Sequence, residues 1–298
     1  MKKTIVSMLC GCVLAGLLGS ATLRAQDGSI VAWGRNNYGQ CNVPAPNTGF
    51  VAVAGGGSAE IAQGHSLGLK ADGSIVAWGA NTYGQWNVPA PNSGFVAVAG
   101  GGGHSLGLKA DGSIVAWGRN SSGQCNVPAP NTGFTAVAGG GWHSLGLKAD
   151  GSIVAWGAGG PGQSGPNDHG QSIVPAPNTG FVALAGGWWH SLGLKADGSI
   201  VAWGDNANGE LNVPAPNTGF VAVAAGYGHS LGLKAHYGDL NCDGAVNNFD
   251  IDPFVLALTD PAAYKLKYPN CDIMNGDCNG DGKVDNFDID PFVELLTP

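Results

Sequence analysis

The sequence contains little charge, and its long central region has no excess of positive charge. Only 11% of the 298 residues are Asp, Glu, Lys or Arg. Residues 26–237 carry seven basic and nine acidic side chains, a net charge of −2. Such a surface offers no basic face to hold phosphates, which argues against a nucleic-acid partner.

Long apolar runs are also scarce, and the longest one lies at the start of the chain. Lys2 and Lys3 precede the apolar stretch Ile5–Leu18, which is too short for a membrane span. Leu23–Ala25 is a plausible cleavage site. We therefore predict that residues 1–25 are a secretory signal peptide and that the protein is secreted or lies at the cell surface. An uncleaved or lipid-linked anchor is the alternative.

Helical periodicity is almost absent from residues 26–237, where one unit occurs five times. The motif Gly-Ser-Ile-Val-Ala-Trp-Gly begins at residues 28, 73, 112, 151 and 198. The basic unit is 39 residues long, with insertions at Ser58–Gln63 and in the segment between Gly157 and Gln171. Gly and Pro fall at fixed positions between apolar segments, so we interpret them as turn residues and not as a sign of disorder.

Each unit is predicted to contain four short strands. In the third unit these are Ser113–Gly118, Gln124–Pro128, Phe134–Ala138 and His143–Lys148. Repeated four-stranded units are typical of a β-propeller. The sequence therefore predicts an all-β propeller of five short four-stranded blades over residues 26–237.

A hairpin of two strands joined by Asp-Gly recurs in complete form, as at His143–Gly157, where the turn is Asp150-Gly151. One half stands alone at Asp27–Gly34 and the other at His229–Ala235. These separate halves predict that the last strand pairs with the first and closes the ring.

The repeated segments Ile-Val-Ala-Trp-Gly, Gly-Gln-x-Asn-Val-Pro, Phe-x-Ala-Val-Ala-Gly-Gly and His-Ser-Leu-Gly-Leu-Lys resemble the regulator of chromosome condensation repeat. The resemblance covers about 210 residues and implies a propeller whose first and last strands meet at closure. Familiar members have seven blades of longer repeats. The nucleotide exchange known for the founding nuclear member is not expected here, because this chain has an export signal and lacks a basic face.

Two aromatic positions recur in every unit. The tryptophans are expected to fill the core between blades; they are Trp33, Trp78, Trp117, Trp156 and Trp203. The histidines are expected to bond backbone groups at a strand start, with a ring of metal ligands as the alternative; they are His65, His104, His143, His190 and His229.

The loops on one face of the predicted disc vary from unit to unit, whereas those on the other face barely change. Variable loops on a rigid scaffold commonly carry binding residues. We predict that aromatic side chains beside Asn-rich loops bind a glycan or a protein, with drift after duplication or plugging of the channel as alternatives. The predicted ligand-binding residues are Tyr38, Tyr83, Trp142, Trp188, Trp189 and Tyr227.

Residues 238–298 form a separate acidic module with two twelve-residue loops. Oxygen-bearing side chains alternate in both loops, and Gly244 and Gly282 occupy the sixth position, where a sharp turn is needed. This pattern predicts two bound Ca²⁺ ions, each loop leading into a short helix, Ile251–Leu258 or Ile289–Leu296. The predicted ligands are Asp239, Asn241, Asp243, Ala245 (backbone), Asn247 and Asp250 in one loop, and Asp277, Asn279, Asp281, Lys283 (backbone), Asp285 and Asp288 in the other.

The paired loops, with Asp at position 12 and a helix only after each loop, resemble a type I dockerin over about 60 residues. The resemblance implies calcium-coupled folding and a cohesin-like or other scaffold partner, with loop positions 10 and 11 helping to set partner choice. These positions are Asn248–Phe249 and Asn286–Phe287, and the Asp-Ile-Asp-Pro-Phe segment that follows departs from cellulosomal examples.

Three cysteines lie in the acidic module and two in the repeats. Of Cys242, Cys271 and Cys278, one pair is expected to bond, and we predict Cys242–Cys271. Cys41 and Cys125 are expected to be buried free thiols, because the blades that carry them are not adjacent.

Three classes of function fit the sequence. The first and preferred class is a secreted, non-catalytic binding protein attached to a scaffold or surface by its tail. The second is a glycoside hydrolase, which needs two carboxylates in a cleft; the irregular acids of the repeats are Glu60, Asp168, Asp205 and Glu210. The third is a purely structural surface protein.

Overall fold

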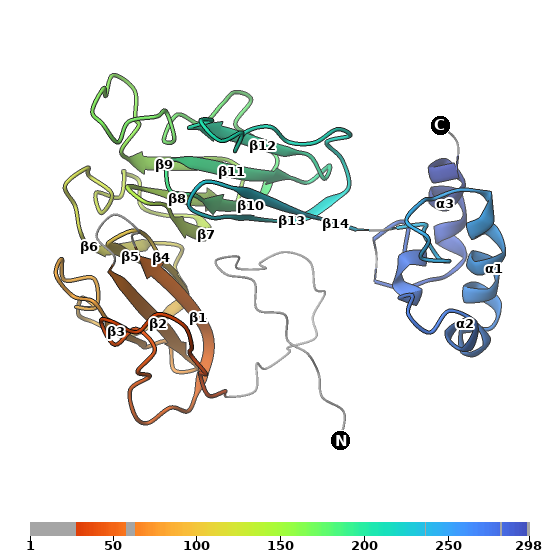
Figure 1. Ribbon diagram of the computed structural model, residues 1–298, viewed down its shortest axis with the longest axis horizontal. Coiled ribbons are helices and arrows are strands. Elements are labelled where there is room, and N and C mark those ends of the chain that lie inside the picture. Colours follow the sequence, from red (N-terminus) through yellow and green to blue (C-terminus); the bar gives the residue numbers. More distant parts are fainter. Residues whose placement is uncertain (1–27, 58–62, 236, 281, 297–298) are drawn as a thin grey trace. The chain divides into compact units, whose positions relative to one another are not determined.

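The computed structural model describes residues 28–57, 63–235, 237–280 and 282–296. The chain divides into two compact units, Met1–Leu233 and Lys234–Pro298. Figure 1 shows the sheets of the first unit and the helices of the second. The predicted signal peptide and most of the insertion at Ser58–Gln63 lie outside the described residues. In the described part of the chain, every helix is too short or too polar to cross a membrane.

The described part of the first unit contains antiparallel sheets that follow one another in chain order (Figure 1). In each sheet the middle strand bonds both neighbours, except in the last sheet, which has two strands. The sheets are β1 (Phe50–Gly57), β2 (Gly64–Lys70) and β3 (Ile75–Gly79); β4 (Phe95–Gly100), β5 (His104–Lys109) and β6 (Ile114–Gly118); β7 (Phe134–Gly139), β8 (His143–Lys148) and β9 (Ile153–Gly157); β10 (Phe181–Gly186), β11 (His190–Lys195) and β12 (Ile200–Gly204); and β13 (Phe220–Ala225) with β14 (Ser230–Lys234). This mostly β architecture is consistent with a propeller.

The prediction of four strands in each blade is wrong, because the segment Gln124–Pro128 and its equivalents form turns. Pro128 and Pro130 have no backbone N–H to give to a strand partner. The N–H of Asn126 instead donates to the Gly123 carbonyl, and the N–H of Cys125 donates to the Asn120 side chain. Local hydrogen bonds therefore replace a sheet ladder in this segment.

The prediction of a hairpin at each Asp-Gly pair is confirmed. In the hairpin of β8 and β9, Leu147 faces Ile153 and Ser144 faces Trp156. Gly151 has a φ of +78°, which a glycine adopts without strain. The Asp150 carboxylate accepts bonds from the backbone N–H and the hydroxyl of Ser152, and these bonds lower the pKa of Asp150.

Neighbouring sheets pack tightly through the repeated tryptophans. Trp156 of β9 packs in one cluster with Leu106 and Ile114 of the preceding sheet and Phe134 of β7. The equivalent residues Trp78, Trp117 and Trp203 are also buried, in agreement with the predicted core role. Trp33 is the exception and is 74% exposed.

The predicted pairing of the first and last strands is absent from the structure. Among the described residues β14 bonds only β13, and residues 29–33 form no strand. Gly28 forms one bridge with Phe50, so the segment lies against the first sheet and not against β14. Leu231 of β14 is 58% exposed, whereas its equivalents in the complete sheets are buried. β14 therefore has an unpaired edge, and residues 29–33 have no strand partner in the described part of the chain.

The second unit consists of short helices around a small core. They are η1 (Asn248–Asp250), α1 (Ile251–Thr259), α2 (Pro261–Lys267), η2 (Ile273–Gly276), η3 (Asn286–Asp288) and α3 (Ile289–Leu296), of which η1, η2 and η3 are 3₁₀ turns. The helices expected after each loop are present as α1 and α3, and α2 is an additional helix that the sequence reasoning missed. Phe254 of α1 and Phe292 of α3 stack with ring centroids 4.1 Å apart.

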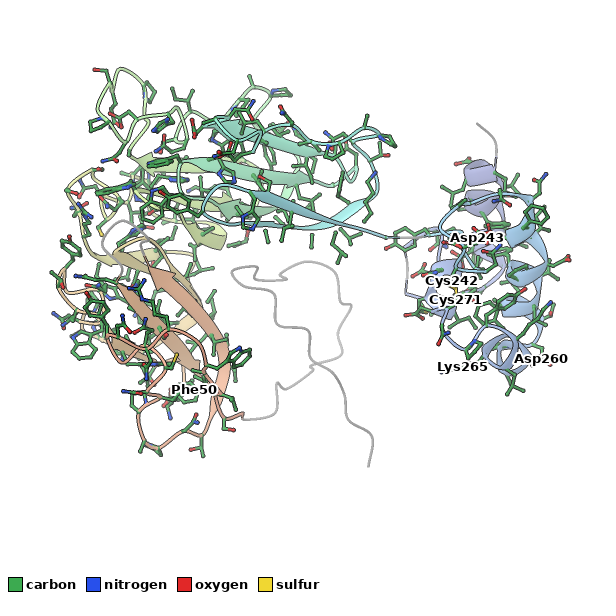
Figure 2. All side chains as sticks on the ribbon, viewed as in Figure 1. Phe50, Cys242, Asp243, Asp260, Lys265 and Cys271 are labelled. Atoms are coloured by element: carbon green, nitrogen blue, oxygen red, sulfur yellow. A yellow bond between two sulfur atoms is a disulfide. The ribbon has the colours of Figure 1, made fainter. Side chains whose placement is uncertain are left out.

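A disulfide joins Cys242 and Cys271 in the second unit (Figure 2). The thiols of Cys41, Cys125 and Cys278 are free. Cys41 and Cys125 are only half-buried, so the expectation that both are buried is wrong. Each donates a weak hydrogen bond to a carbonyl oxygen of its own loop, that of Arg35 or Arg119.

Candidate functional site

Four of the predicted ligand-binding rings lie in one contiguous group, which we call the aromatic cluster: Trp142, Trp188, Trp189 and Tyr227. They come from the connections between β7 and β8, β10 and β11, and β13 and β14. The Trp188 ring stacks on Tyr227 with centroids 5.2 Å apart and meets Trp142 edge-on at 6.5 Å. Trp189 contacts both Trp188 and Tyr227.

The backbones of neighbouring sheets approach closely beneath the cluster. The Gly141 N–H donates to the Gly187 carbonyl, and the Trp188 N–H donates to the Gly226 carbonyl. A Cβ on Gly141 would lie 2.6 Å from the Trp188 carbonyl oxygen, closer than real contacts allow. Glycine at this position therefore permits the sheets to come together and places the rings side by side.

The four rings differ in exposure. Trp142 and Trp188 are buried, Trp189 is half-buried and Tyr227 is 46% exposed. The indole N–H groups of Trp142, Trp188 and Trp189 are all buried without a hydrogen-bond partner. The cluster thus has a buried base and an accessible edge, and only Trp189 and Tyr227 offer substantial surface to a ligand.

Arg119 extends the cluster toward Tyr83. Its guanidinium lies 3.7 Å from the centroid of the Trp142 ring and 4.7 Å from that of Tyr83. Its Nε donates to the Ser121 hydroxyl at 3.2 Å. The sequence analysis did not single out Arg119, although it stands in a variable loop. A cation held between two rings is a stable arrangement and brings a positive charge to the site.

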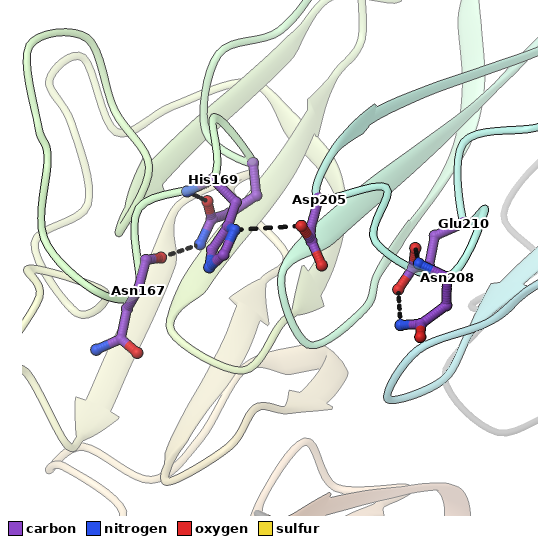
Figure 3. Close-up of polar contacts among 6 residues, drawn as sticks. Asn167, His169, Asp205, Asn208 and Glu210 are labelled. Carbon is purple, nitrogen blue, oxygen red and sulfur yellow. Dashed lines mark hydrogen bonds and ion pairs between the residues drawn. The ribbon is translucent and has the colours of Figure 1, made fainter.

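His169 and Asp205 form a polar pair (Figure 3), and both contact Trp189. The His169 Nδ1 is 3.3 Å from an Asp205 carboxylate oxygen, and its ring centroid is 5.2 Å from that of Trp189. His169 belongs to the long inserted loop, where the Asp168 carboxylate accepts the N–H groups of Gly159 and Gly165. The insertion supplies His169, and the loop after β12 supplies Asp205, so a polar pair that the sequence did not predict lies at one side of the cluster.

Tyr38 is not part of this group. Its ring contacts no other ring in the described residues, and its backbone N–H donates to the Gln40 side chain. A cavity of about 290 Å³ adjoins the cluster and is lined by glycines at the C-terminal ends of β1, β4, β7 and β10 and directly after the last three, together with Trp188 and Tyr227. The cluster therefore combines aromatic surface with exposed backbone groups.

Four of the five repeated histidines join one sheet to the next. The Nε2 of His104 lies 2.9 Å from the Ser144 hydroxyl, and His65, His143 and His190 contact Ser105, Ser191 and Ser230 in the same way. The partner on the next sheet is a hydroxyl, which was not expected, and the expected backbone contact is present beside it, since a backbone group of the next histidine raises the pKa of His65 and of His104. Burial lowers the pKa of His65 to about 4, and burial together with a neighbouring histidine lowers those of His104 and His143 to about 3.

The first acidic loop holds two buried carboxylates. Asp239 accepts the N–H groups of Asp243 and Gly244, and Asp250 accepts those of Leu240, Asn241 and Asn247. Neither carboxylate has a Lys or Arg partner among the described residues. Burying such charges is unfavourable without a compensating cation, so the oxygen donor set fits a hard ion.

The second loop repeats these contacts. Asp277 accepts the N–H of Gly282, and Asp288 accepts those of Asn279 and Asp285. Asp281 lies outside the described residues. In the described parts of both loops, no three acidic or imidazole side chains gather closely enough to hold an ion alone. Calcium would therefore also need amide oxygens such as that of Asn241, and backbone carbonyls.

Residues 63–85, 95–124, 134–163 and 181–210 match the family described as Regulator of chromosome condensation (RCC1) repeat. These four segments are RCC1-type repeats. No curated protein matches the chain. The RCC1 match indicates no catalytic family, and it does not extend to the acidic module.

Solved structures share the RCC1-type fold. Human WBSCR16 is 21% identical, with a TM-score of 0.51, over 67% of this chain and 66% of that protein. Prp20p from Saccharomyces cerevisiae is 21% identical, with a TM-score of 0.50, over 64% of this chain and 57% of that protein; its structure was described with its binding to Gsp1p and histones. The chain thus spans less than two thirds of the length of either protein.

Proposed function

We propose that this is an exported, non-catalytic binding protein. In this proposal the propeller binds a glycan at the aromatic cluster, and the calcium-loaded tail attaches the protein to a scaffold or cell-surface partner. The observation that carries the proposal is the contiguous group formed by Trp188, Trp189 and Tyr227, with polar side chains at both ends.

A sugar ring matches this arrangement in chemistry. Its C–H faces stack on aromatic rings, while its hydroxyl groups need donors and acceptors around their rim. Arg119 provides donors at one end of the cluster, and the His169–Asp205 pair provides both kinds of group at the other. A protein loop is the other ligand that such a surface accommodates.

The acids of the repeats give no support to glycoside hydrolysis. Asp168 accepts backbone N–H groups of its own loop, Asp205 pairs with His169, and Glu210 accepts two bonds from Asn208. Burial alone would raise the pKa of Glu210, but the Asn208 bonds outweigh it and lower that pKa. A general acid needs a raised pKa, so Glu210 is poorly suited to this role. Glu60 lies outside the described residues.

Exposed apolar side chains in the tail support attachment to a partner protein. Phe249 and Phe287 occupy the same position in the two loops, and each is 78% exposed. Val255 and Val293, on the helices that follow, are each half exposed. Such side chains gain free energy when a partner covers them. The dockerin-like pattern makes a cohesin-like protein the partner that we propose.

Calcium would be held in each loop by the carboxylates at positions 1, 3, 5 and 12 or by the amide oxygens that replace them. The ion supplies positive charge among clustered acids and fixes the loop that precedes each helix. Asp239 and Asp250 are already oriented by backbone N–H groups. This orientation lowers the entropy lost when the ion binds.

The binding test uses the full chain on a panel of polysaccharides, scored for binding and for released sugar. Trp189→Ala and Tyr227→Ala should each weaken binding at least about tenfold, because each removes a stacking surface. Trp86→Ala is the matched control, since Trp86 is exposed outside the cluster. Released sugar would identify an enzyme, and equal binding by all variants would refute the proposed site.

A further inference from the structure

The start of the row of sheets has a strand segment without a partner, and the last sheet lacks a strand of the same sequence. Residues 29–34 have the sequence Ser-Ile-Val-Ala-Trp-Gly, which is also the sequence leading into and forming β3, β6, β9 and β12. In each complete sheet that segment pairs with the middle strand. β14 is a middle strand without it, and residues 29–34 are the one copy in the described chain that pairs with no middle strand.

The last sheet also has an unfilled tryptophan site. In the sheet before it, Trp203 packs against Leu145, Ile153 and Phe181. The equivalent residues one sheet later are Leu192, Ile200 and Phe220, and their cluster contains no tryptophan. A cavity of about 250 Å³ lies there, lined by these three residues with Glu210, Val213 and β14. Its walls are those that surround a tryptophan elsewhere in the chain.

Hydrogen bonds identify which tryptophan this site fits. The indole N–H groups of Trp78, Trp117, Trp156 and Trp203 donate to the backbone carbonyls of Gln40, Gln85, Gln124 and Gln171. Each of these carbonyls also accepts a serine hydroxyl. The Glu210 carbonyl accepts Ser230 but no indole in the described structure. Trp33 is the exposed member of the same series.

Two further sets of repeated hydrogen bonds between neighbouring sheets also end at the last sheet. Each histidine of the repeats contacts a serine on the next sheet, but His229 has no such serine and Ser66 no such histidine among the described residues. The N–H groups of Gly57, Gly102, Gly141 and Trp188 donate to a glycine carbonyl of the next sheet. At the equivalent positions, the N–H of Tyr227 in the last sheet would donate to the Gly56 carbonyl of the first. Every contact missing at the end of the row is therefore available at its start.

We propose that this boundary joins two copies of the chain head to tail. Residues 29–34 of one copy pair with β14 of the other, and Trp33 enters the cavity beside Glu210. A second copy is favoured over closure within one chain because β14 and residues 29–34 do not pair in this structure. The chain also covers only 66% of WBSCR16 and 57% of Prp20p, so it matches a part of each of these folds.

The proposed register predicts a specific crosslink. In the complete sheets Leu67 faces Ala77 and Leu106 faces Ala116, so Leu231 should face Ala32 of the neighbouring copy. Full-length Ala32→Cys and Leu231→Cys proteins of different tag size are mixed under mild oxidation. A mixed disulfide dimer is expected. Each variant alone, and Ala32→Cys mixed with Val96→Cys, are the controls, since Val96 is exposed on β4.

Light scattering of the unmodified full chain provides the second measurement. The mass should rise above that of the monomer with concentration. Trp33→Ala should return the monomer, whereas Trp86→Ala should leave the mass unchanged. A monomer at all concentrations would overturn the proposal. A doubly substituted chain that crosslinks only within itself would also overturn it, because the ring would then close within one chain.

Discussion

At the scale of single residues, stability depends on a few side chains that bond across sheet boundaries. The Gln124 backbone carbonyl accepts both the Ser144 hydroxyl and the Trp156 indole. The Asn131 side chain donates to the Ile114 carbonyl and accepts the Ile114 N–H, so it acts as a strand partner. These bonds satisfy polar groups that the short strands leave unpaired.

The buried histidines predict that stability falls in mild acid. The folded-state pKa values of His65, His104 and His143 are well below the ordinary 6.5. Below pH 6.5 the unfolded chain therefore binds more protons than the folded chain, and stability decreases as pH falls. At pH 5 the loss is on the order of 2 kcal/mol for each histidine.

Urea unfolding of the full chain at pH 7.5 and pH 5 measures this effect. His104→Gln should reduce the difference between the two midpoints, and His169→Gln, at a partly exposed histidine, should not. Equal midpoints at the two pH values would show that the buried histidines do not control stability.

At the scale of elements, the strands are shaped by glycines that face aromatic rings. A Cβ on Gly146 of β8 would lie 2.6 Å from the Phe134 ring, whereas a Cβ on Gly55 of β1 would meet nothing within 4 Å. The same contact recurs between Gly107 and Phe95 and between Gly193 and Phe181. Each middle strand therefore needs glycine at its centre.

This geometry predicts different outcomes for two glycine substitutions. Gly146→Ala should lower the free energy of unfolding by about 1–3 kcal/mol, because the ring must move to admit a methyl group. Gly55→Ala, also in a strand, should change it by less than about 0.5 kcal/mol at a dilution where the chain is monomeric, because no second copy then covers this position. The two variants are compared by urea unfolding at pH 7.5, and equal destabilisation would contradict the packing argument.

The elements were predictable where local chemistry determines them. Asp-Gly turns between short apolar segments determine the hairpins, and the loop pattern determines the positions of α1 and α3. The second predicted strand failed because Pro128 and Pro130 remove backbone donors that a ladder needs. Arg119 and His169 could not be found from the sequence, because each joins the aromatic cluster through contacts between loops far apart in the chain.

At the scale of the whole molecule, the chain divides into a nearly neutral β unit and an acidic helical unit. Residues 238–298 contain three basic and twelve acidic side chains. Their repulsion opposes folding of a core that consists mainly of Leu240, Phe254, Tyr264 and Phe292. The two units should therefore respond differently to removal of calcium.

We predict that a chelator abolishes the helical circular dichroism signal of the full chain and leaves the β signal intact. Asp239→Ala combined with Asp277→Ala should reproduce this loss in the presence of calcium, because both loops lose their first ligand. Asp290→Asn removes an exposed charge of α3 outside the loops and should have little effect. An unchanged helical signal in excess chelator would contradict the calcium assignment.

Because the same contacts recur at each sheet boundary, these contacts do not fix the number of units in the chain. His104 and Ser144, or Trp156 and Gln124, would serve equally well between any two neighbours. A duplication of one 39-residue unit within the gene would bring all its own contacts with it. Such a chain can therefore gain or lose whole units without a compensating substitution. The exposed surfaces of its first and last units stay the same, however many units lie between them.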